Sequence, residues 1–206
     1  MTQLFLASAS PRRAELLAQI AVPFERILPV FDEQRLADES PRDYVSRLAS
    51  GKAEAGRRLL TVQSSTQPRC VLGADTIVVL GDTVFGKPAN AADHHRMMKA
   101  LSDSAHQVLT AVTLLCSVGE GSEQPWRQQK LLSSTEVRFK PLSDAEIQAY
   151  WASKEPRDKA GGYAIQGIGA LFVASISGSY SGVVGLPLYE TGQLLARAGV
   201  ATPLSN

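Results

Sequence analysis

The sequence predicts a mixed α/β domain, and three observations support this. Apolar runs of strand length alternate with amphipathic stretches of helical length, a pattern typical of a sheet covered by helices. The 206 residues suffice for one core, because a domain of roughly 150 residues already buries about 70% of its unfolded surface. No internal repeat or low-complexity tract divides the chain, so we expect residues 1–206 to form a single domain around one cleft.

The chain opens with the pattern of a strand, a tight turn and a helix. Leu4–Ser8 is strand-like, and the Ser10-Pro11 pair that follows suits the N-cap and first position of a helix. A second helix start lies at Ser40-Pro41, with apolar residues at helical spacing after it and Lys52 one turn further along.

The remaining elements follow from apolar periodicity and from turn residues. We expect a turn at 73–76 between two strand halves and a loop at Gly119–Gln129. The predicted strands are Cys70–Leu72, Ile77–Leu80, Val108–Ser117, Leu131–Phe139 and Ala170–Ile176, and the predicted helices are Asn90–Leu101, Ser143–Ser153 and Leu188–Ala198.

The composition excludes several classes of protein. Lys and Arg number 21 and Asp and Glu 20, a formal charge of +1, so nucleic-acid binding is not expected. No apolar run approaches the roughly 18 residues of a membrane span, and Leu4–Ala7 is too short for the core of a signal peptide. Cys70 and Cys116 lie in apolar runs and match no zinc or redox motif. We therefore expect a cytoplasmic protein with buried, reduced thiols and no membrane association.

The first candidate site is the N-terminal turn. Ser8, Ser10, Arg12 and Arg13 lie where a strand leads into a helix, and a helix N-terminus offers unpaired N–H groups to a phosphate. The guanidinium group of arginine matches phosphate oxygens. The alternative is a capped surface helix with two solvated arginines.

Asp75 is the second candidate, because it stands between two strongly apolar strand halves. A carboxylate there is costly to bury unless it is paired, hydrogen-bonded or bound to a metal, so it suits a base or a ligand. The alternative is a plain turn aspartate. Lys87 in a turn and Glu33 in an acidic loop are further candidates, with solvated side chains as the alternative for both.

The three histidines are not expected to bind metal. His94 and His95 are adjacent on a predicted helix, so their side chains point in different directions. Together with His106 they are predicted to be surface or capping residues.

Taken together, these motifs resemble the Maf family of nucleoside-triphosphate pyrophosphatases, which is related to septum-formation inhibitors. The resemblance covers nearly the whole chain in the family's order, apart from a loop at Gly119–Gln129 that looks longer than in close relatives. The matching segments are Leu6–Arg13, Glu33, Leu48–Ala53, Gly73–Thr76, Lys87–Pro88, Asp158–Gly167 and Gly185–Pro187.

The resemblance implies a fold, a cofactor and an assembly. The fold would be a mixed sheet in two lobes around a central cleft, similar to the inosine-triphosphate pyrophosphatases. The enzyme would hydrolyse a nucleoside triphosphate to the monophosphate and pyrophosphate, would depend on a divalent cation such as Mg²⁺ or Mn²⁺, and would form a homodimer.

The resemblance also indicates the subgroup and the residue roles. Arg12, Thr76 and Gln166 match the subgroup that acts on dTTP and UTP, whereas the subgroup acting on 7-methyl-GTP carries Trp, Gln and Glu at these positions. Modified pyrimidine triphosphates are an alternative substrate class. The expected roles are Asp75 as the proton acceptor, Glu33 and Asp75 as metal ligands, Arg12, Thr76 and Gln166 in base choice, and Ser8, Arg12, Arg13, Lys52 and Lys87 in phosphate binding.

An alternative function from another class is a non-catalytic regulator that binds nucleotides or nucleic acid. This alternative would agree with the family's relation to septum-formation inhibitors. The near-neutral charge counts against nucleic acid, and Asp75 among cationic residues counts against an inactive enzyme.

Overall fold

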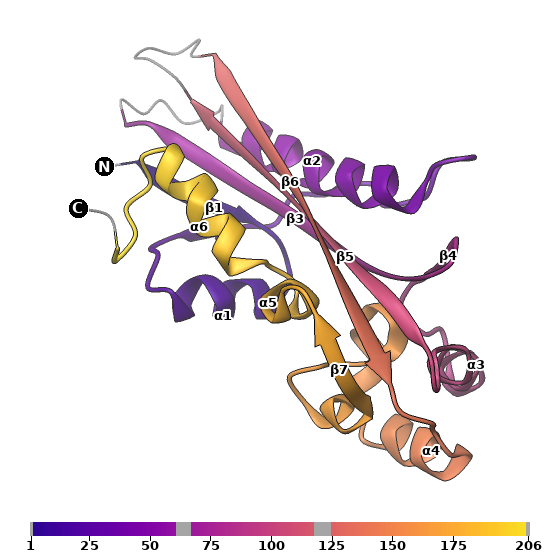
Figure 1. The fold of residues 1–206 in the computed structure, drawn as a ribbon. Helices are drawn as coiled ribbons and strands as arrows, with labels where there is room; N and C mark the ends of the chain where they lie inside the picture. Colours follow the sequence, from indigo (N-terminus) through magenta and orange to yellow (C-terminus); the bar gives the residue numbers. More distant parts are fainter. Residues whose placement is uncertain (1, 61–66, 118–124, 205–206) are drawn as a thin grey trace. The chain divides into compact units, whose positions relative to one another are not determined.

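A computed structural model describes residues 2–60, 67–117 and 125–204 (Figure 1). The chain divides into two compact units. The first unit comprises Met1–Asp75, Thr110–Leu132 and Gly185–Asn206, and the second comprises Thr76–Leu109 and Ser133–Val184.

The described residues form a seven-stranded mixed sheet in the order β2-β1-β3-β5-β6-β7, with β4 paired to β3 off this path. β1 pairs in parallel with β2 and β3, whereas β3 with β4 and β6 with β7 are antiparallel. The strands are β1 (Gln3–Ala7), β2 (Glu25–Ile27), β3 (Arg69–Leu80), β4 (Thr83–Phe85), β5 (Ala105–Ser117), β6 (Trp126–Phe139) and β7 (Val173–Ser177).

Six α-helices and three short 3₁₀ helices complete the described part of the chain. In the ranges given above, no helix is both long and apolar enough to cross a membrane. The helices are α1 (Pro11–Gln19), α2 (Pro41–Leu60), α3 (Ala91–Leu101), α4 (Asp144–Ala152), α5 (Tyr180–Val184), α6 (Leu188–Arg197), η1 (Glu155–Asp158), η2 (Ala160–Gly162) and η3 (Ile168–Phe172). The predicted α/β class is therefore confirmed.

In the first unit, helices lie on both sides of the strands. Figure 1 shows α2 on one side and α1 and α6 on the other. Alternate residues of a strand point to opposite faces, and Phe5, Ala7 and Val71 pack with Ala53 of α2 in one buried cluster. Buried leucines of α1 and α6, including the fully buried Leu17, belong to the other side. The sheet is thus covered by apolar helix faces.

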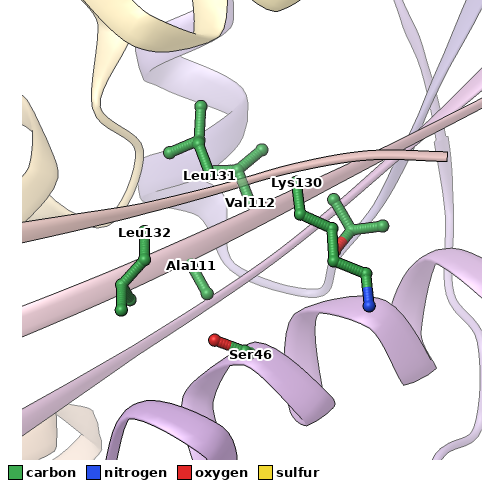
Figure 2. Close-up of a pocket in the computed structure, with 7 residues that line it drawn as sticks. Ser46, Ala111, Val112, Lys130, Leu131 and Leu132 are labelled. Atoms are coloured by element: carbon green, nitrogen blue, oxygen red, sulfur yellow. The ribbon is translucent and has the colours of Figure 1, made fainter.

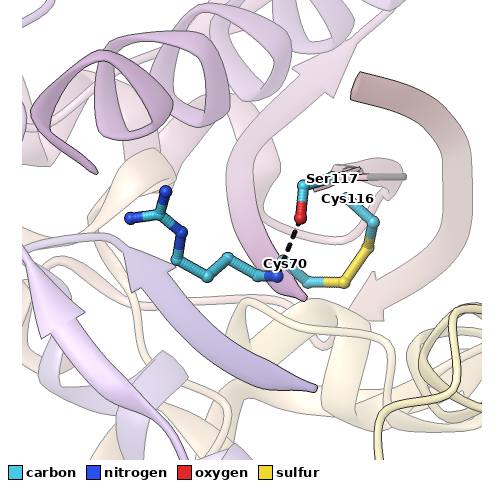
Figure 3. The surroundings of a disulfide bond; sticks show 4 residues. Cys70, Cys116 and Ser117 are labelled. Carbon is cyan, nitrogen blue, oxygen red and sulfur yellow. Dashed lines mark hydrogen bonds between the residues drawn. A yellow bond between two sulfur atoms is a disulfide. The ribbon is translucent and has the colours of Figure 1, made fainter. Parts of the chain in front are cut away.

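The two cysteines correct one prediction. Cys70 of β3 and Cys116 of β5 are buried in strands, as expected, but they form a disulfide rather than two reduced thiols. Beside the bond, the backbone N–H of Arg69 donates to Ser117 Oγ at 2.9 Å (Figure 3). The two neighbouring strands are therefore joined covalently and by a hydrogen bond at the same level.

The second unit has an aromatic core. Phe139 of β6 makes edge contacts with His106, Tyr163 and Phe172. The prediction that the histidines lie on the surface or in caps is wrong for two of them, because His94 is 0% and His106 2% exposed. His94 Nε2 lies 3.1 Å from Gly162 O and His106 Nε2 lies 2.8 Å from Tyr163 Oη, so each imidazole has a polar partner inside the core.

Several predicted elements differ in detail. The two strand halves at 70–80 form one continuous strand, so the predicted turn at 73–76 is wrong. β6 begins at Trp126, inside the predicted loop Gly119–Gln129, of which residues 119–124 lie outside the described part. The predicted helix start at Ser143 is confirmed, because Ser143 forms a capping box with Glu146 at the start of α4. Ser10 occupies the N-cap position of α1, but its side chain makes no capping bond.

Candidate active site

Asp75 lies in the middle of β3, close to the point where α2 packs against the strand. Gly73, two residues earlier and therefore on the same face, has no side chain to separate the two backbones. A Cβ at Gly73 would lie 2.4 Å from Ala49 O and 2.5 Å from Ala53 N, both in α2. Glycine thus lets α2 pack directly on β3 and brings the helix close to Asp75.

Lys52 of α2 connects two carboxylates. Its ammonium nitrogen lies 2.6 Å from Asp75 Oδ1 and 2.8 Å from Glu33 Oε1. The side chains of Lys52 and Asp75 are 12% and 10% exposed, whereas that of Glu33 is 57% exposed. A mostly buried ion pair is therefore extended to the surface by a second carboxylate, and three of the predicted site residues lie together.

Arg13 and Ser8 organise the turn between β1 and α1. The Arg13 guanidinium donates to Gly185 O at 2.9 Å and to Ser8 Oγ at 3.3 Å, and the same hydroxyl accepts from the Ser10 backbone N–H at 3.2 Å. Ser8 is 4% and Arg13 8% exposed. Arg13 is therefore a buried structural cation of this turn as well as a candidate for binding phosphate.

Charge interactions connect this turn with the Lys52 cluster. Burial lowers the pKa of Arg13, and the neighbouring charge of Arg12 lowers it further. The carboxylates of Asp75 and Glu33 act in the opposite direction. Arg12, Asp75 and Glu33 thus all lie within electrostatic range of the Arg13 guanidinium.

The segment that carries Glu33 is held on α2. Tyr44 Oη donates to Glu33 O at 2.9 Å, and an Arg47 guanidinium nitrogen donates to Gln34 O at 2.9 Å. The Phe31 ring fills a notch left by Gly51, where a Cβ would lie 2.0 Å from Phe31 Cζ. Burial raises the pKa of Tyr44, and the charges of Asp75 and Glu33 raise it further.

Three predicted site residues belong to the second unit. Thr76 directly follows Asp75 in β3 and is half-buried, while Lys87 and Gln166 are exposed. Gln166 lies in a turn between η2 and η3. Their roles stay predictions.

The carboxylates of Glu33 and Asp75 carry oxygen ligands that suit a hard divalent cation. The described residues include no group of three or more His, Cys, Asp or Glu side chains placed to hold a metal ion. Glu33 and Asp75 nevertheless converge on one ammonium, and Mg²⁺ is usually held by one or two carboxylates together with substrate phosphates and water. These two residues therefore fit a divalent cation whose remaining ligands are not protein carboxylates.

A small cavity lies elsewhere in the first unit. It measures about 170 Å³ and is lined by Ser46 of α2 and by Ala111–Thr113 and Lys130–Leu132 of β5 and β6 (Figure 2). Its walls are mainly apolar, and none of the predicted site residues lines it. We therefore do not count it as part of the candidate site.

Four residues support the site in ways that the sequence did not predict, although two of them, Gly51 and Gly73, lie inside the matching segments Leu48–Ala53 and Gly73–Thr76. Arg26 of β2 donates to Ala9 O at 3.0 Å and to Ser8 O at 3.5 Å, which holds the N-terminal turn. Gly51 and Gly73 permit the close packing described above. A glycine in a helical or strand pattern was the signal for both, whereas nothing in the sequence marked Arg26 or Tyr44.

Comparison with known proteins places the chain in a family. A family model described as "Maf-like protein" matches residues 3–198. A dTTP/UTP pyrophosphatase of Pseudoalteromonas atlantica is 51% identical, covering 96% of this chain and 98% of that protein. Proteins of the same name from Shewanella oneidensis and Vibrio cholerae are 52% and 50% identical, covering 96% and 95% of this chain and 98% and 97% of their own.

A solved structure of the Staphylococcus aureus Ham1 protein aligns with 66% of this chain and 71% of its own, with 12% identity and a TM-score of 0.39. That similarity is too low to bear on the argument. The family model and the relatives that match over nearly their whole length show the family on their own: the chain belongs to the Maf-like family.

Proposed function

We propose that this protein hydrolyses dTTP and UTP to the nucleoside monophosphate and pyrophosphate. The observation that carries the proposal is the Lys52 bridge, which joins Asp75 and Glu33 within electrostatic range of the buried Arg13. The relatives named dTTP/UTP pyrophosphatase match nearly the whole chain at about half identity, which supports the same substrate class here.

In the proposed reaction, a water oxygen attacks the α-phosphorus, and the bond from that phosphorus to the α–β bridging oxygen breaks. Asp75 accepts the proton of the attacking water, as a positioned carboxylate can. Pyrophosphate leaves with the electron pair of the broken bond. The monophosphate therefore carries the oxygen that came from water.

The cations would stabilise the negative charge that builds up on the phosphoryl oxygens. Preorganised charge of this kind is usually the largest contribution to catalysis. We assign this role to Arg12, Lys52 and Lys87, with Arg13 and Ser8 shaping the turn that binds phosphate. Lys52 also keeps the carboxylate of Asp75 in a fixed position, because its nitrogen lies 2.6 Å from Oδ1.

A divalent metal held by Glu33 and Asp75 would neutralise phosphate charge and activate water when bound. The residues fit such an ion for the reason given above, and Mg²⁺ or Mn²⁺ suits oxygen ligands. Lys52 would then remain beside the same two carboxylates as a fixed charge.

Base selectivity is assigned to Arg12, Thr76 and Gln166. A glutamine amide provides one acceptor and two donors, which suits the alternating carbonyl and N–H groups on the edge of uracil or thymine. A purine or a modified guanine presents a different edge and leaves a group without a partner. We also propose that the protein acts as a homodimer, on the family resemblance alone.

Steady-state kinetics with four nucleotides test the proposal. Values of kcat/KM for dTTP and UTP should exceed those for GTP and 7-methyl-GTP by at least roughly tenfold, since an unpaired polar group costs about 1–3 kcal/mol. Pyrophosphate should be the co-product. A preference for either guanine nucleotide would refute the subgroup, and nucleotide binding without turnover would favour a non-catalytic regulator.

A further inference from the structure

Gln166 lies in a tight turn whose backbone is defined by hydrogen bonds. The Gly167 N–H donates to Ala164 O at 3.2 Å, and Ala170 N–H donates to Gly167 O at 3.1 Å. Ile165 is buried at 7% exposure, whereas the next residue, Gln166, is exposed. The turn thus buries the side chain of Ile165 in the core and exposes that of Gln166 to solvent.

A tyrosine and a glutamate hold both flanks of this turn. Tyr150 Oη accepts from the Ala164 N–H at 3.0 Å on one flank and donates to Glu155 Oε1 at 2.8 Å. On the other flank, the Glu155 carboxylate accepts from the N–H groups of Ile168 at 2.9 Å and Gly169 at 3.0 Å. One connected pair of side chains therefore fixes the backbone before and after Gln166.

Two glycines lie tightly against this pair. A Cβ at Gly167 would lie 2.3 Å from Glu155 Oε2, and one at Gly169 would lie 2.7 Å from Tyr150 Oη. Both distances are well below van der Waals contact. The two glycines therefore allow the turn to lie directly against the Tyr150–Glu155 pair.

The protonation state of Glu155 suits an acceptor. Burial acts to raise the pKa of Glu155, but the hydrogen bonds from Ile168, Gly169 and Tyr150 outweigh it, so the pKa lies below its usual range. An ionised carboxylate accepts hydrogen bonds and donates none. All three donors can thus be satisfied by one side chain at neutral pH.

We propose that Glu155 and Tyr150 are positioning residues that determine base selectivity by fixing the turn that presents Gln166. The inference rests on the proposed function, because it assumes that Gln166 contacts the base. Neither residue is expected to take part in bond breaking, which is assigned to Asp75. Their loss should reduce discrimination between nucleotides more than it reduces turnover.

Two variants remove hydrogen bonds of the Tyr150–Glu155 pair in different ways, and we call them the clamp variants. Glu155→Gln keeps the size of the side chain, but an amide nitrogen cannot accept from a backbone N–H. Tyr150→Phe removes only the hydroxyl, and it provides the test if Glu155→Gln fails to fold. Glu136→Gln is the matched control, because Glu136 is an exposed residue of β6 in the same unit. We expect the ratio of kcat/KM for UTP to that for GTP to fall roughly tenfold in both clamp variants and to be unchanged in the control.

A double-mutant cycle with Gln166→Ala separates positioning from general destabilisation. If Glu155 acts through Gln166, Glu155→Gln should have no further effect on the UTP/GTP ratio once Gln166 is alanine. An unchanged ratio in both clamp variants, or a loss that adds fully to that of Gln166→Ala, would overturn this inference alone. If the unmodified protein shows no pyrimidine preference, or Gln166→Ala retains it, the proposed base recognition fails and this inference fails with it.

Discussion

Replacing Gly73 by alanine tests whether the direct packing of α2 on β3 positions the Lys52–Asp75 pair. The new Cβ would lie 2.4 Å from Ala49 O and 2.5 Å from Ala53 N. Both are backbone atoms of α2, so neither can rotate away as a flexible side chain could. The helix must therefore move away from the strand.

The size of the effect follows from these distances. Reaching ordinary contact of about 3.5 Å requires a displacement of about 1 Å. Inserting one methyl group into a packed interior costs about 1–3 kcal/mol, which for a chain of this size lowers Tm by roughly 2–12 °C. Because Lys52 lies on the displaced helix, its 2.6 Å contact with Asp75 should lengthen, and a misplacement of about 1 Å can reduce the rate roughly 10²-fold.

Thermal unfolding and kcat/KM for dTTP measure the two effects on the same samples. Gly192→Ala is the matched control, because a Cβ at Gly192 meets nothing within 4 Å and alanine in a helix should stabilise by about 0.5–1 kcal/mol. Normal stability and activity in Gly73→Ala would refute the close-packing argument. So would an equal loss in Gly192→Ala.

Three further predictions concern the base, the pH dependence and the disulfide. Asp75→Asn should lower kcat by roughly 10² or more, and near-normal turnover would exclude Asp75 as the base. Burial lowers the pKa of His106 from about 6.5, its value in the unfolded chain, to about 4 in the folded protein. Between these two pH values the unfolded state is protonated at His106 and the folded state is not, so acid favours unfolding. Stability measured by urea unfolding should then fall by about 2 kcal/mol from pH 7 to pH 5. This loss should be smaller in His106→Gln and unchanged in His95→Gln; part of it should persist in His106→Gln, because burial also lowers the pKa of His94. An identical loss in all three proteins would contradict the assignment. The Cys70–Cys116 bond closes a separation of 46 residues, so reduction should cost about 2–4 kcal/mol. Thiol titration of denatured, non-reduced protein should find no free cysteine, and two free thiols would contradict the bond.

Much of the fold followed from local signals in the sequence. The capping box at Ser143, the N-cap at Asn90 and the apolar period of α2 each mark a helix through contacts within one or two turns. These contacts depend on residues close in sequence, so their patterns are readable without the tertiary structure.

The errors arose where tertiary contacts override local preference. Gly73-Ala74-Asp75 has the composition of a turn, yet pairing with neighbouring strands keeps it extended in β3. His94 and His106 are polar, yet each finds a polar partner in the core. The Cys70–Cys116 bond depends on the pairing of β3 with β5, which the spacing of the cysteines does not encode.

The candidate site was predicted as separate motifs, and only the fold joins some of them. Glu33 and Asp75 are far apart in sequence, but both carboxylates contact the ammonium group of Lys52. No local sequence pattern reveals this arrangement. The supporting contacts of Arg26 and Tyr44 are also long-range. Gln166 was identified by family resemblance, and its role stays a prediction.

The most direct test of the account is hydrolysis of dTTP in ¹⁸O-labelled water, with mass spectrometry of both products. Attack on the α-phosphorus predicts the label in thymidine monophosphate and unlabelled pyrophosphate. Orthophosphate with thymidine diphosphate, or label in pyrophosphate, would contradict the proposed reaction.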